Sequence, residues 1–466
     1  MNTHSSMSRL FAFLLFAFFA PYAVSAAPQS ASQVWEGELP NGLKVLVKSD
    51  HRAPVVVCML WYRVGSMDET SGTTGVAHVL EHMLFKGTRK VPAGEFSRII
   101  SEAGGRDNAF TSRDYTGYFQ TLHKSQLGLA LELEADRMVN AVLSPEEFAK
   151  EIRVVMEERR WRTDDRPRAL VYEQLNAAAF KAHPYRNPVI GWMDDLQNMT
   201  VEDARAFYER WYAPNNATLV IVGDVKPEEV MKLARRHFGP LERKTLPPRR
   251  ITEEPPQLGP LQLTVRAPAE LPYVLMAFRA PALRDPENEW EPYALEMLAN
   301  VLDGNEAARL NRILVREQRI ASSASAGYDG VNRGPGMFLL SGTPTPGTTA
   351  VELERALRAE VAKLVAEGVT EEELQRVKSQ VIASRVYERD SMFFQARQIG
   401  AVEMAGLPHT LIDLFVEKLK TVTAEQVVAV AQKYLVDDTL TVAYLDPQPL
   451  SGKRMLGPPP GARHAQ

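Results

Sequence analysis

The sequence predicts an α+β fold made of two homologous α/β-sandwich domains, each a mixed, mostly antiparallel sheet covered by helices. The first supporting observation is an internal repeat. A capped helix followed by a hydrophobic strand begins at Thr200, and the same pair begins 223 residues later at Thr423. The second observation is that strands and helices are mixed along each half, which is typical of a sheet covered by helices. Together they predict an internal duplication.

A second repeated pair lies upstream of the first. Helices are predicted to open at Ser144 and at Thr370, an offset of 226 residues. Each begins with Ser/Thr-x-x-Glu, the capping-box pattern that gives partners to free backbone amides in the first turn. Pro145 fits the first helical position, where no amide hydrogen bond is lost. The similar offsets indicate two similar halves.

The elements of the first half can be taken in order. Asn41-Gly42 predicts a hairpin turn between two short strands. The hydrophobic pattern then predicts a strand over 55–63, helices over 75–85 and 95–103, a strand over 115–122 and an amphipathic helix over 127–140. This order gives a sheet with helices packed on it.

Changes in composition predict five parts in the chain. They are a signal peptide (1–27), an N-terminal domain (28–240), a stiff, proline-rich linker (241–262), a C-terminal homologous domain (263–446) and a flexible tail (447–466).

The first residues have the layout of a secretory signal. Residues 10–20 form an unbroken apolar run, and small residues follow at 24–27. The run is too short for a bilayer, which needs about 20 apolar residues, and no other stretch approaches that length. We therefore expect a protein exported to the periplasm with no stable membrane span. A signal that stays uncleaved as an anchor is the alternative.

The composition excludes several classes of protein. Lysine and arginine number 54 against 58 acidic residues, a net charge of −4, so we expect no nucleic-acid surface. The single cysteine, Cys58, excludes an intramolecular disulfide, a cysteine-based zinc finger and an iron–sulfur cluster. Because it lies in an apolar run, we interpret Cys58 as a core residue.

The strongest chemical signal is His78-Val79-Leu80-Glu81-His82. Residues four apart lie on one face of a helix, so His78 and His82 can approach one metal ion. Glu81 projects nearby and can reach a water molecule on that ion. The order His-x-x-Glu-His is the inverted zincin motif. Two surface histidines on an ordinary helix are the alternative.

A catalytic zinc site needs a third protein ligand and one open position. The helix that opens at Ser144 carries Glu151 and Glu158 on one face. Glu158 is a candidate third ligand, and Glu151 a candidate for orienting a histidine. Acidic residues on a helix are usually solvated, so only the pairing with the histidines supports these roles. The positions 226 residues later are Val377 and Ser384, so only the first half should bind metal.

These motifs resemble the pitrilysin/insulinase family of zinc metallopeptidases. The resemblance is closest to its two-domain subunits, which include the mitochondrial processing peptidase, and it covers nearly the whole mature chain. It is carried by the metal motif in its setting at 75–87, by Glu158 at the family's distance beyond His82, and by the stretch 104–114 (GGRDNAFTSRD).

The resemblance implies a role for each motif residue. His78, His82 and Glu158 would bind one zinc ion per chain. Glu81 would be the general base, and Glu151 matches the family's accessory acid.

The resemblance also implies that Asn108 and Ala109 line a strand edge where a peptide lies extended. An exposed edge offers backbone hydrogen bonds to peptides of any sequence. The alternative for Asn108 is an ordinary turn residue.

One stretch departs from the family pattern. Family active sites are completed by an arginine and a tyrosine from a C-terminal-type domain. The corresponding residues 314–322 contain Arg316 and Arg319, but Ser322 stands where the tyrosine is expected. We therefore expect a homologous, zinc-free partner subunit that supplies this pair.

The function expected from these residues is an exported, zinc-dependent endopeptidase that hydrolyses unfolded or short peptides. The alternative is a non-catalytic assembly or scaffold subunit with the same fold. An exported substrate-binding protein is a third class, but the sequence shows no ligand-pocket signature for it.

Overall fold

The computed structural model describes residues 33–249 and 252–450. The expected signal peptide and residues 451–466 of the expected tail lie outside these ranges. From Val34 onward the chain forms one unit by its internal contacts. Among the described residues, no helix has both the length and the apolar character needed to cross a bilayer.

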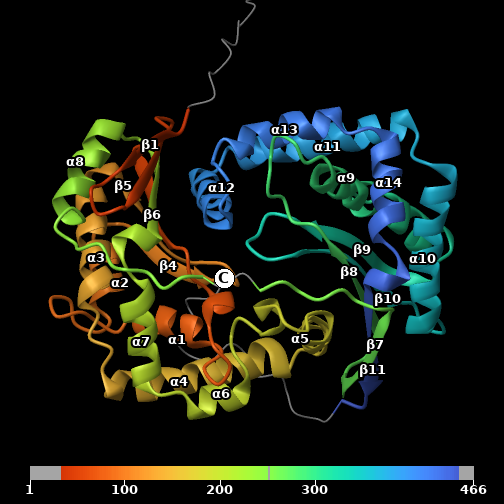
Figure 1. Cartoon of the computed structure of the whole chain (residues 1–466), viewed down its shortest axis with the longest axis horizontal. Helices are drawn as coiled ribbons and strands as arrows, with labels where there is room; N and C mark the ends of the chain where they lie inside the picture. The colour runs from red at the N-terminus through yellow and green to blue at the C-terminus, as the bar shows by residue number, and fades with distance from the viewer. Residues whose placement is uncertain (1–32, 250–251, 451–466) are drawn as a thin grey trace, which may run out of the picture. The chain divides into compact units, whose positions relative to one another are not determined.

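The first sheet contains six strands in the order β1-β2-β6-β3-β5-β4 (Figure 1). Their bounds are β1 Trp35–Glu38, β2 Lys44–Ser49, β3 Val55–Tyr62, β4 Arg106–Thr111, β5 Thr116–His123 and β6 Ala217–Gly223. Only β2 and β6 pair in parallel; the other neighbours are antiparallel. Strand β4 is therefore an edge strand. Gly42 adopts φ +87° in the turn between β1 and β2, which is the hairpin predicted at Asn41-Gly42.

The second sheet repeats this arrangement. It contains five strands in the order β7-β11-β8-β10-β9, which matches β2-β6-β3-β5-β4 of the first sheet, and its one parallel pair is β7 with β11. The strands are β7 Leu261–Pro268, β8 Tyr273–Ala280, β9 Ala321–Asp329, β10 Gly336–Pro344 and β11 Leu440–Gln448. The same topology in both halves confirms the predicted α+β fold of two similar domains. Strand β11 extends two residues beyond the expected start of the tail.

Helices cover both sheets. The first half contains α1 Val76–Met83, α2 Glu95–Glu102, α3 Leu127–Asn140, α4 Pro145–Arg159, α5 Pro167–Ala179, α6 Met193–Asn198, α7 Val201–Trp211 and α8 Pro227–His237. The second half contains α9 Glu291–Asp303, α10 Ala350–Glu367, α11 Glu371–Glu388, α12 Met392–Ala405, α13 Leu411–Thr421 and α14 Ala424–Tyr434.

The predicted helix caps are present at all four repeated positions. Thr200 and Thr423 each form a complete capping box with the third helical residue. At Ser144 and Thr370 the hydroxyl accepts the amide of Glu147 or Glu373, which is one half of the predicted box. The caps fix where α7, α14, α4 and α11 begin.

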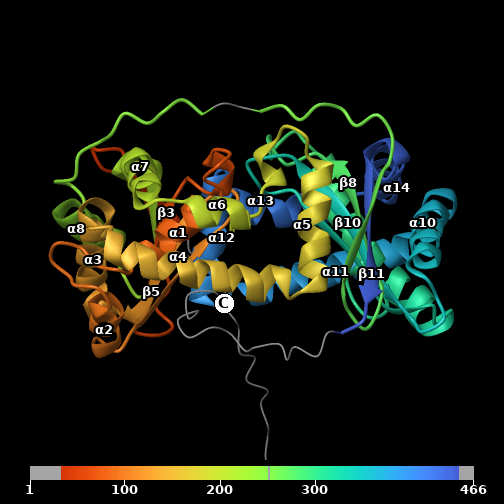
Figure 2. The same cartoon turned by 90° about the horizontal axis from the view of Figure 1, so that it is seen from below.

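The two halves exchange one helix each. Helix α5 of the first half packs on β7, β8 and β11 of the second sheet (Figure 2). Helix α12 of the second half packs on β3 and β6 of the first sheet. Val171 and Leu175 of α5 share a core with Ala443 of β11, and Ile399 of α12 shares one with Trp61 of β3. Each sheet is thus closed on one face by a helix from the other half.

The predicted linker has no helix or strand in its described residues, 241–249 and 252–260, and β7 begins at Leu261. It has contacts with both halves. Arg249 pairs with Asp68 at 2.7 Å. The Glu254 carboxylate accepts backbone amides of residues 181–183 and pairs with Arg279 of β8 at 3.1 Å.

Candidate metal centre

Helix α1 is held in the interior of the first half, and all eight of its residues are buried. Its first residue follows Gly75, which has φ +89°. A Cβ at this position would lie 2.5 Å from the carbonyl oxygen of Ile190. Glycine is therefore required twice over, for the left-handed backbone and for the close approach of the neighbouring segment. This contact fixes the helix that carries His78, Glu81 and His82.

Three predicted ligands meet between α1 and α4. The Oε2 atom of Glu158 lies 3.4 Å from Nε2 of His82 and 3.8 Å from Nε2 of His78. One potential ligand atom from each residue lies within 4.8 Å of the others. All three residues are buried. Two imidazoles from one helical turn and one carboxylate from a distant helix thus face a common point.

The separations fit a shared metal ion better than hydrogen bonds. Ligand atoms about 2.0–2.2 Å from a tetrahedral zinc ion lie roughly 3.4 Å from each other. Direct N–H···O hydrogen bonds are shorter, at about 2.9–3.0 Å. In the described part of the chain, no hydrogen bond reaches the buried Oε2 of Glu158. Oε1 of the same carboxylate pairs with Nε of Arg162 at 2.9 Å, so Oε2 is the oxygen that remains for a metal ion, and the donor set of two imidazoles and one carboxylate suits zinc.

Glu81 lies beside this group without belonging to it. Its carboxylate is buried, and its Oε2 accepts a hydrogen bond of 2.5 Å from the Thr111 hydroxyl at the end of β4. Burial raises the pKa of Glu81 to about 7 in the metal-free protein. A positioned carboxylate with a pKa near neutrality can accept or donate a proton at physiological pH.

Glu151 lies on the opposite side of His82. Its Oε2 is 3.3 Å from Nδ1 of His82, and its Oε1 is 2.7 Å from Nζ of Lys86. A carboxylate on the second ring nitrogen fixes the tautomer and orientation of a metal-binding histidine. Sequence analysis assigned this orienting role to Glu151, and the geometry is consistent with it.

The two histidines differ in their preferred protonation. Burial, together with the neighbouring His82, lowers the pKa of His78 to about 3. Burial also lowers the pKa of His82, but the hydrogen bond to Glu151 and the negative charges of Glu158 and Glu81 outweigh this effect and raise it to about 9. His78 is therefore neutral and ready to bind a metal, whereas His82 must release a proton when it does so.

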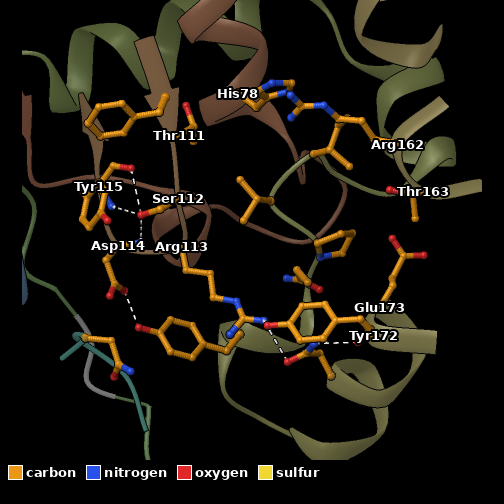
Figure 3. A pocket seen from close by; sticks show the side chains of 18 of the residues that line it. His78, Thr111, Ser112, Arg113, Asp114, Tyr115, Arg162, Thr163, Tyr172 and Glu173 are labelled. Atoms are coloured by element: carbon orange, nitrogen blue, oxygen red, sulfur yellow. Dashed lines mark hydrogen bonds between the residues drawn. The ribbon is translucent and has the colours of Figure 1, made fainter. Parts of the chain in front are cut away.

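The group opens into a pocket of about 680 Å³. His78 and Glu81 line one end, and residues 109–115 form one wall (Figure 3). The remaining lining residues come from the segment 162–190, from Asp329 at the end of β9, and from Val331 and Asn332 between β9 and β10. The candidate metal site thus faces a space large enough for several side chains of a bound peptide.

The predicted peptide-binding residues lie on edge strand β4. Ala109 lines the pocket, and its amide donates to the Asn108 side-chain oxygen at 2.9 Å. Strand β4 pairs on one side only, with β5. The free edge of β4 therefore faces the pocket. On this edge the Ala109 amide donates its hydrogen bond to the side chain of the neighbouring Asn108 and not to another strand.

Comparison with known proteins identifies the family. Residues 44–192 match the family model described as insulinase (peptidase family M16), and residues 198–381 match the model described as the peptidase M16 inactive domain. The zinc protease PqqE of Helicobacter pylori is 32% identical over 414 residues, which cover 88% of this chain and 92% of that protein. The chain belongs to the insulinase family, peptidase family M16.

Other members of the M16 family agree with this assignment. The zinc protease ML0855 of Mycobacterium leprae is 30% identical over 405 residues, covering 85% of this chain and 88% of that protein. The crystal structure of a protease from Helicobacter pylori has a TM-score of 0.85 and 31% identity, covering 89% of this chain and all of that one. The resemblance to this family and the fold class predicted from the sequence are both confirmed.

A stretch of this M16 chain that spans the end of the first half and much of the second matches a model described as inactive. Residues 198–381 contain no His-x-x-Glu-His motif. A structure of a peptidase M16 inactive domain from Pseudomonas fluorescens shares the fold, with a TM-score of 0.80 and 19% identity. The ligands that the sequence predicts are thus all in the half that matches the insulinase model.

Several residues in and around the pocket were not predicted from the sequence. Tyr185 donates a hydrogen bond of 2.5 Å to Asp114, and the backbone amide of Arg333 donates to the same carboxylate at 2.9 Å. The Arg333 side chain forms two hydrogen bonds to Asp68. The sequence signal was present for Asp114, which lies in the family-like stretch 104–114, but its partners are 71 and 219 residues away.

The stretch that departs from the family pattern lies elsewhere. Arg316 is exposed and pairs with Glu306 at 2.6 Å, and Ser322 on β9 donates to the carbonyl of Thr343 at 3.1 Å. None of the described residues 314–322 lines the pocket that contains His78 and Glu81. Within this chain, the segment does not supply an arginine–tyrosine pair to the pocket.

Proposed function

We propose that this protein is a zinc-dependent endopeptidase that hydrolyses unfolded or short peptides, with one zinc ion held by His78, His82 and Glu158. The observation that carries the proposal is the convergence of these three buried side chains beside a pocket. The names of the relatives, which are zinc proteases, support the choice of metal.

The chemistry needs a Lewis acid and a base. A bound zinc ion supplies the Lewis acidity that activates water and polarises the scissile carbonyl. Glu81 takes a proton from the attacking water and passes it to the leaving amine. The hydrogen bond from Thr111 holds the Glu81 carboxylate toward the pocket.

Glu151 acts through His82 rather than on the substrate. Its contact with Nδ1 keeps Nε2 of His82 directed at Oε2 of Glu158. Lys86 holds the other Glu151 oxygen and so restricts the carboxylate to one orientation. Glu151 is therefore a positioning residue for the metal ligand.

The substrate is an extended peptide paired with the free edge of β4. Carbonyl groups of the peptide accept hydrogen bonds from backbone amides near Ala109. The Asn108 side chain, whose oxygen accepts the Ala109 amide in the absence of substrate, moves away to free that amide. Folded proteins have few free strands of this kind, so the edge selects unfolded or short peptides.

We further propose export and a partner subunit. The apolar run at 10–20 supports export, and the protease PqqL of Escherichia coli, which shares the fold at 21% identity and a TM-score of 0.77, is described as periplasmic. The exposed position of Arg316 and the serine at position 322 support a homologous, zinc-free subunit that supplies the missing arginine and tyrosine. The division of the chain into a signal peptide, an N-terminal domain, a linker, a C-terminal domain and a tail is also a proposal.

The match to an M16 inactive domain favours a second candidate, a non-catalytic assembly subunit. A zinc-content measurement and a peptide-library cleavage assay on the purified chain separate the two. We expect one zinc ion per chain and cleavage that chelation abolishes, with Glu81→Gln retaining zinc while losing at least about 100-fold in kcat. A chain that binds no zinc, or an active Glu81→Gln variant, contradicts the proposed endopeptidase. If activity requires a co-purifying homologue, the partner proposal is supported.

A further inference from the structure

We propose that Arg113 is a binding site for a carboxylate of the peptide substrate, provided by an acidic side chain or by a free C-terminus. This inference rests on the proposed peptidase function and names a substrate class for it. The preference for a substrate with a carboxylate at this position would arise from Arg113 in the pocket wall and not from the metal ion.

Arg113 is a pocket cation held by neutral groups. Its Nη2 donates to the Tyr172 hydroxyl at 3.2 Å and to the Asn176 side-chain oxygen at 2.9 Å. Its guanidinium also lies over the rings of Tyr172 and Tyr185, at 5.8 and 5.0 Å from their centroids. Figure 3 shows the side chain reaching across the pocket toward Tyr172. These contacts fix the plane of the guanidinium before any ligand arrives.

The charge of Arg113 is not neutralised by contact. Within residues 33–249 and 252–450, no carboxylate oxygen approaches it within the 4.0 Å of an ion pair. Two pocket acids nearby have other partners. Asp114 accepts hydrogen bonds from Tyr185 and from the amide of Arg333, and Glu173 pairs with Arg159 at 2.8 Å. Asp329, on the wall from the second half, forms no ion pair with Arg113 in the described ranges, although the Arg113 charge acts on it from a distance and partly offsets the rise in its pKa that burial causes.

The guanidinium has donors left for a ligand. Both hydrogen bonds that it forms in the described ranges come from Nη2, so those of Nε and Nη1 remain. A carboxylate can accept two parallel hydrogen bonds from a guanidinium, which is the preferred geometry for this pair. Arg113 is half-buried, and a charge pair there is stronger than at an open surface.

The position of Arg113 matches the proposed path of a peptide. Strand β4 ends at Thr111, whose hydroxyl contacts Glu81, and Arg113 follows two residues later. A peptide that pairs with the edge of β4 and continues beyond Thr111 therefore passes Arg113 a few residues from the scissile bond. The metal site, β4 and Arg113 all line one pocket.

A structural role is the alternative, because Arg113 also links the β4–β5 turn to α5. A peptide series separates the two. One cleavable neutral peptide is made with Gln replaced by Glu at each position in turn, and with its C-terminus free or amidated. The zinc-loaded wild type, Arg113→Gln and Arg186→Gln are compared by kcat/KM. Arg186 lines the same pocket, and its Nη1 contacts the carbonyl of Lys181, so this control removes a pocket charge elsewhere.

We expect the wild type to prefer one acidic peptide over its neutral counterpart by roughly 10- to 100-fold, mainly through KM. Arg113→Gln should remove this preference by lowering kcat/KM for the acidic peptide far more than for its neutral counterpart, and Arg186→Gln should keep the preference. A preference for an internal Glu identifies a side-chain carboxylate, and a preference for the free acid over the amide identifies a C-terminus.

Three results overturn the inference while leaving the peptidase proposal intact. The first is that the wild type cleaves acidic and neutral peptides with the same kcat/KM. The second is that Arg113→Gln lowers kcat/KM by the same factor for every peptide. The third is that Arg186→Gln loses the acidic preference as fully as Arg113→Gln does. If Arg113→Gln does not fold, Arg113→Met, which also removes the charge, is used, and an unchanged preference in that variant also overturns the inference. Failure of the zinc-loaded wild type to cleave any peptide instead contradicts the proposed function itself.

Discussion

Gly400 of α12 packs directly against the indole of Trp61 on β3. A Cβ built at Gly400 would lie 2.0 Å from Cε2 and 2.3 Å from Nε1 of that ring. The contact joins a helix of the second half to the sheet of the first, within the buried cluster that contains Ile399. The exchange of helices between the halves thus depends on the absence of a side chain at position 400.

We predict that Gly400→Ala destabilises the protein. Overpacking a rigid interface costs about 1–3 kcal/mol, which exceeds the roughly 0.5–1 kcal/mol that alanine gains over glycine in a helix. Urea denaturation monitored by tryptophan fluorescence measures the change in the free energy of unfolding. Gly128→Ala is the matched control, because Gly128 is also helical and its Cβ would meet only Leu233 at 3.7 Å. A stabilised Gly400→Ala variant would contradict the packing argument.

The domain architecture could be predicted because its signals are local. The hydroxyls of Thr200 and Thr423 cap helices within three residues, and the repeat of those caps reveals the duplication. The exchange of α5 and α12 could not be predicted in this way. An apolar helix face shows that Val171 must be buried, but not which of two similar sheets buries it.

The difference between local signals and contacts made only by the fold also applies to the candidate site. His78 and His82 are one helical turn apart, and Glu158 shares a helix face with Glu151. Sequence spacing was therefore enough to predict these residues as candidates. The setting of Arg113 depends on Tyr172 and Asn176, which are 59 and 63 residues away on a different element. Only the fold brings these residues together, and local spacing contains no signal for them.

We predict that Glu158→Gln loses the metal. The amide is a weaker zinc ligand than the carboxylate, and it carries no charge to balance the ion. Zinc content after dialysis, measured by mass spectrometry, should fall from about one ion per chain to near zero. Glu157→Gln is the control, because Glu157 is exposed and pairs only with Arg160 in the described ranges. Full zinc content in Glu158→Gln would remove Glu158 from the ligand set.

We predict that Glu151→Gln weakens zinc binding without abolishing it. The substitution leaves the three ligands in place but removes the charge that orients His82 through Nδ1. Loss of such a supporting carboxylate typically costs 10- to 100-fold in metal affinity. Competition with a chelator of known affinity measures the change. Glu147→Gln, one turn earlier on α4 and paired with Lys150, should leave the affinity unchanged.

The last prediction concerns His183, which lies at the junction of the two halves. Its Nδ1 accepts the backbone amide of Tyr185, and a Cβ at Gly334 would lie 2.6 Å from its Cε1. Burial lowers the pKa of His183 from 6.5 to about 4, although Glu254 acts in the opposite direction. The folded protein therefore favours the neutral ring, which keeps Nδ1 free to accept the amide.

This shift makes the stability depend on pH. Between pH 6.5 and about 4 the unfolded chain binds more protons at His183 than the folded chain. The contribution of His183 is thus fully present above pH 6.5 and is lost as the pH falls toward 4, by up to about 3 kcal/mol. At pH 5 the loss is about 2 kcal/mol. His183→Asn keeps a cap acceptor but cannot titrate. Urea denaturation of the metal-free proteins at pH 7 and pH 5 should show a smaller acid-induced loss for His183→Asn, and an equal loss would contradict the role of His183.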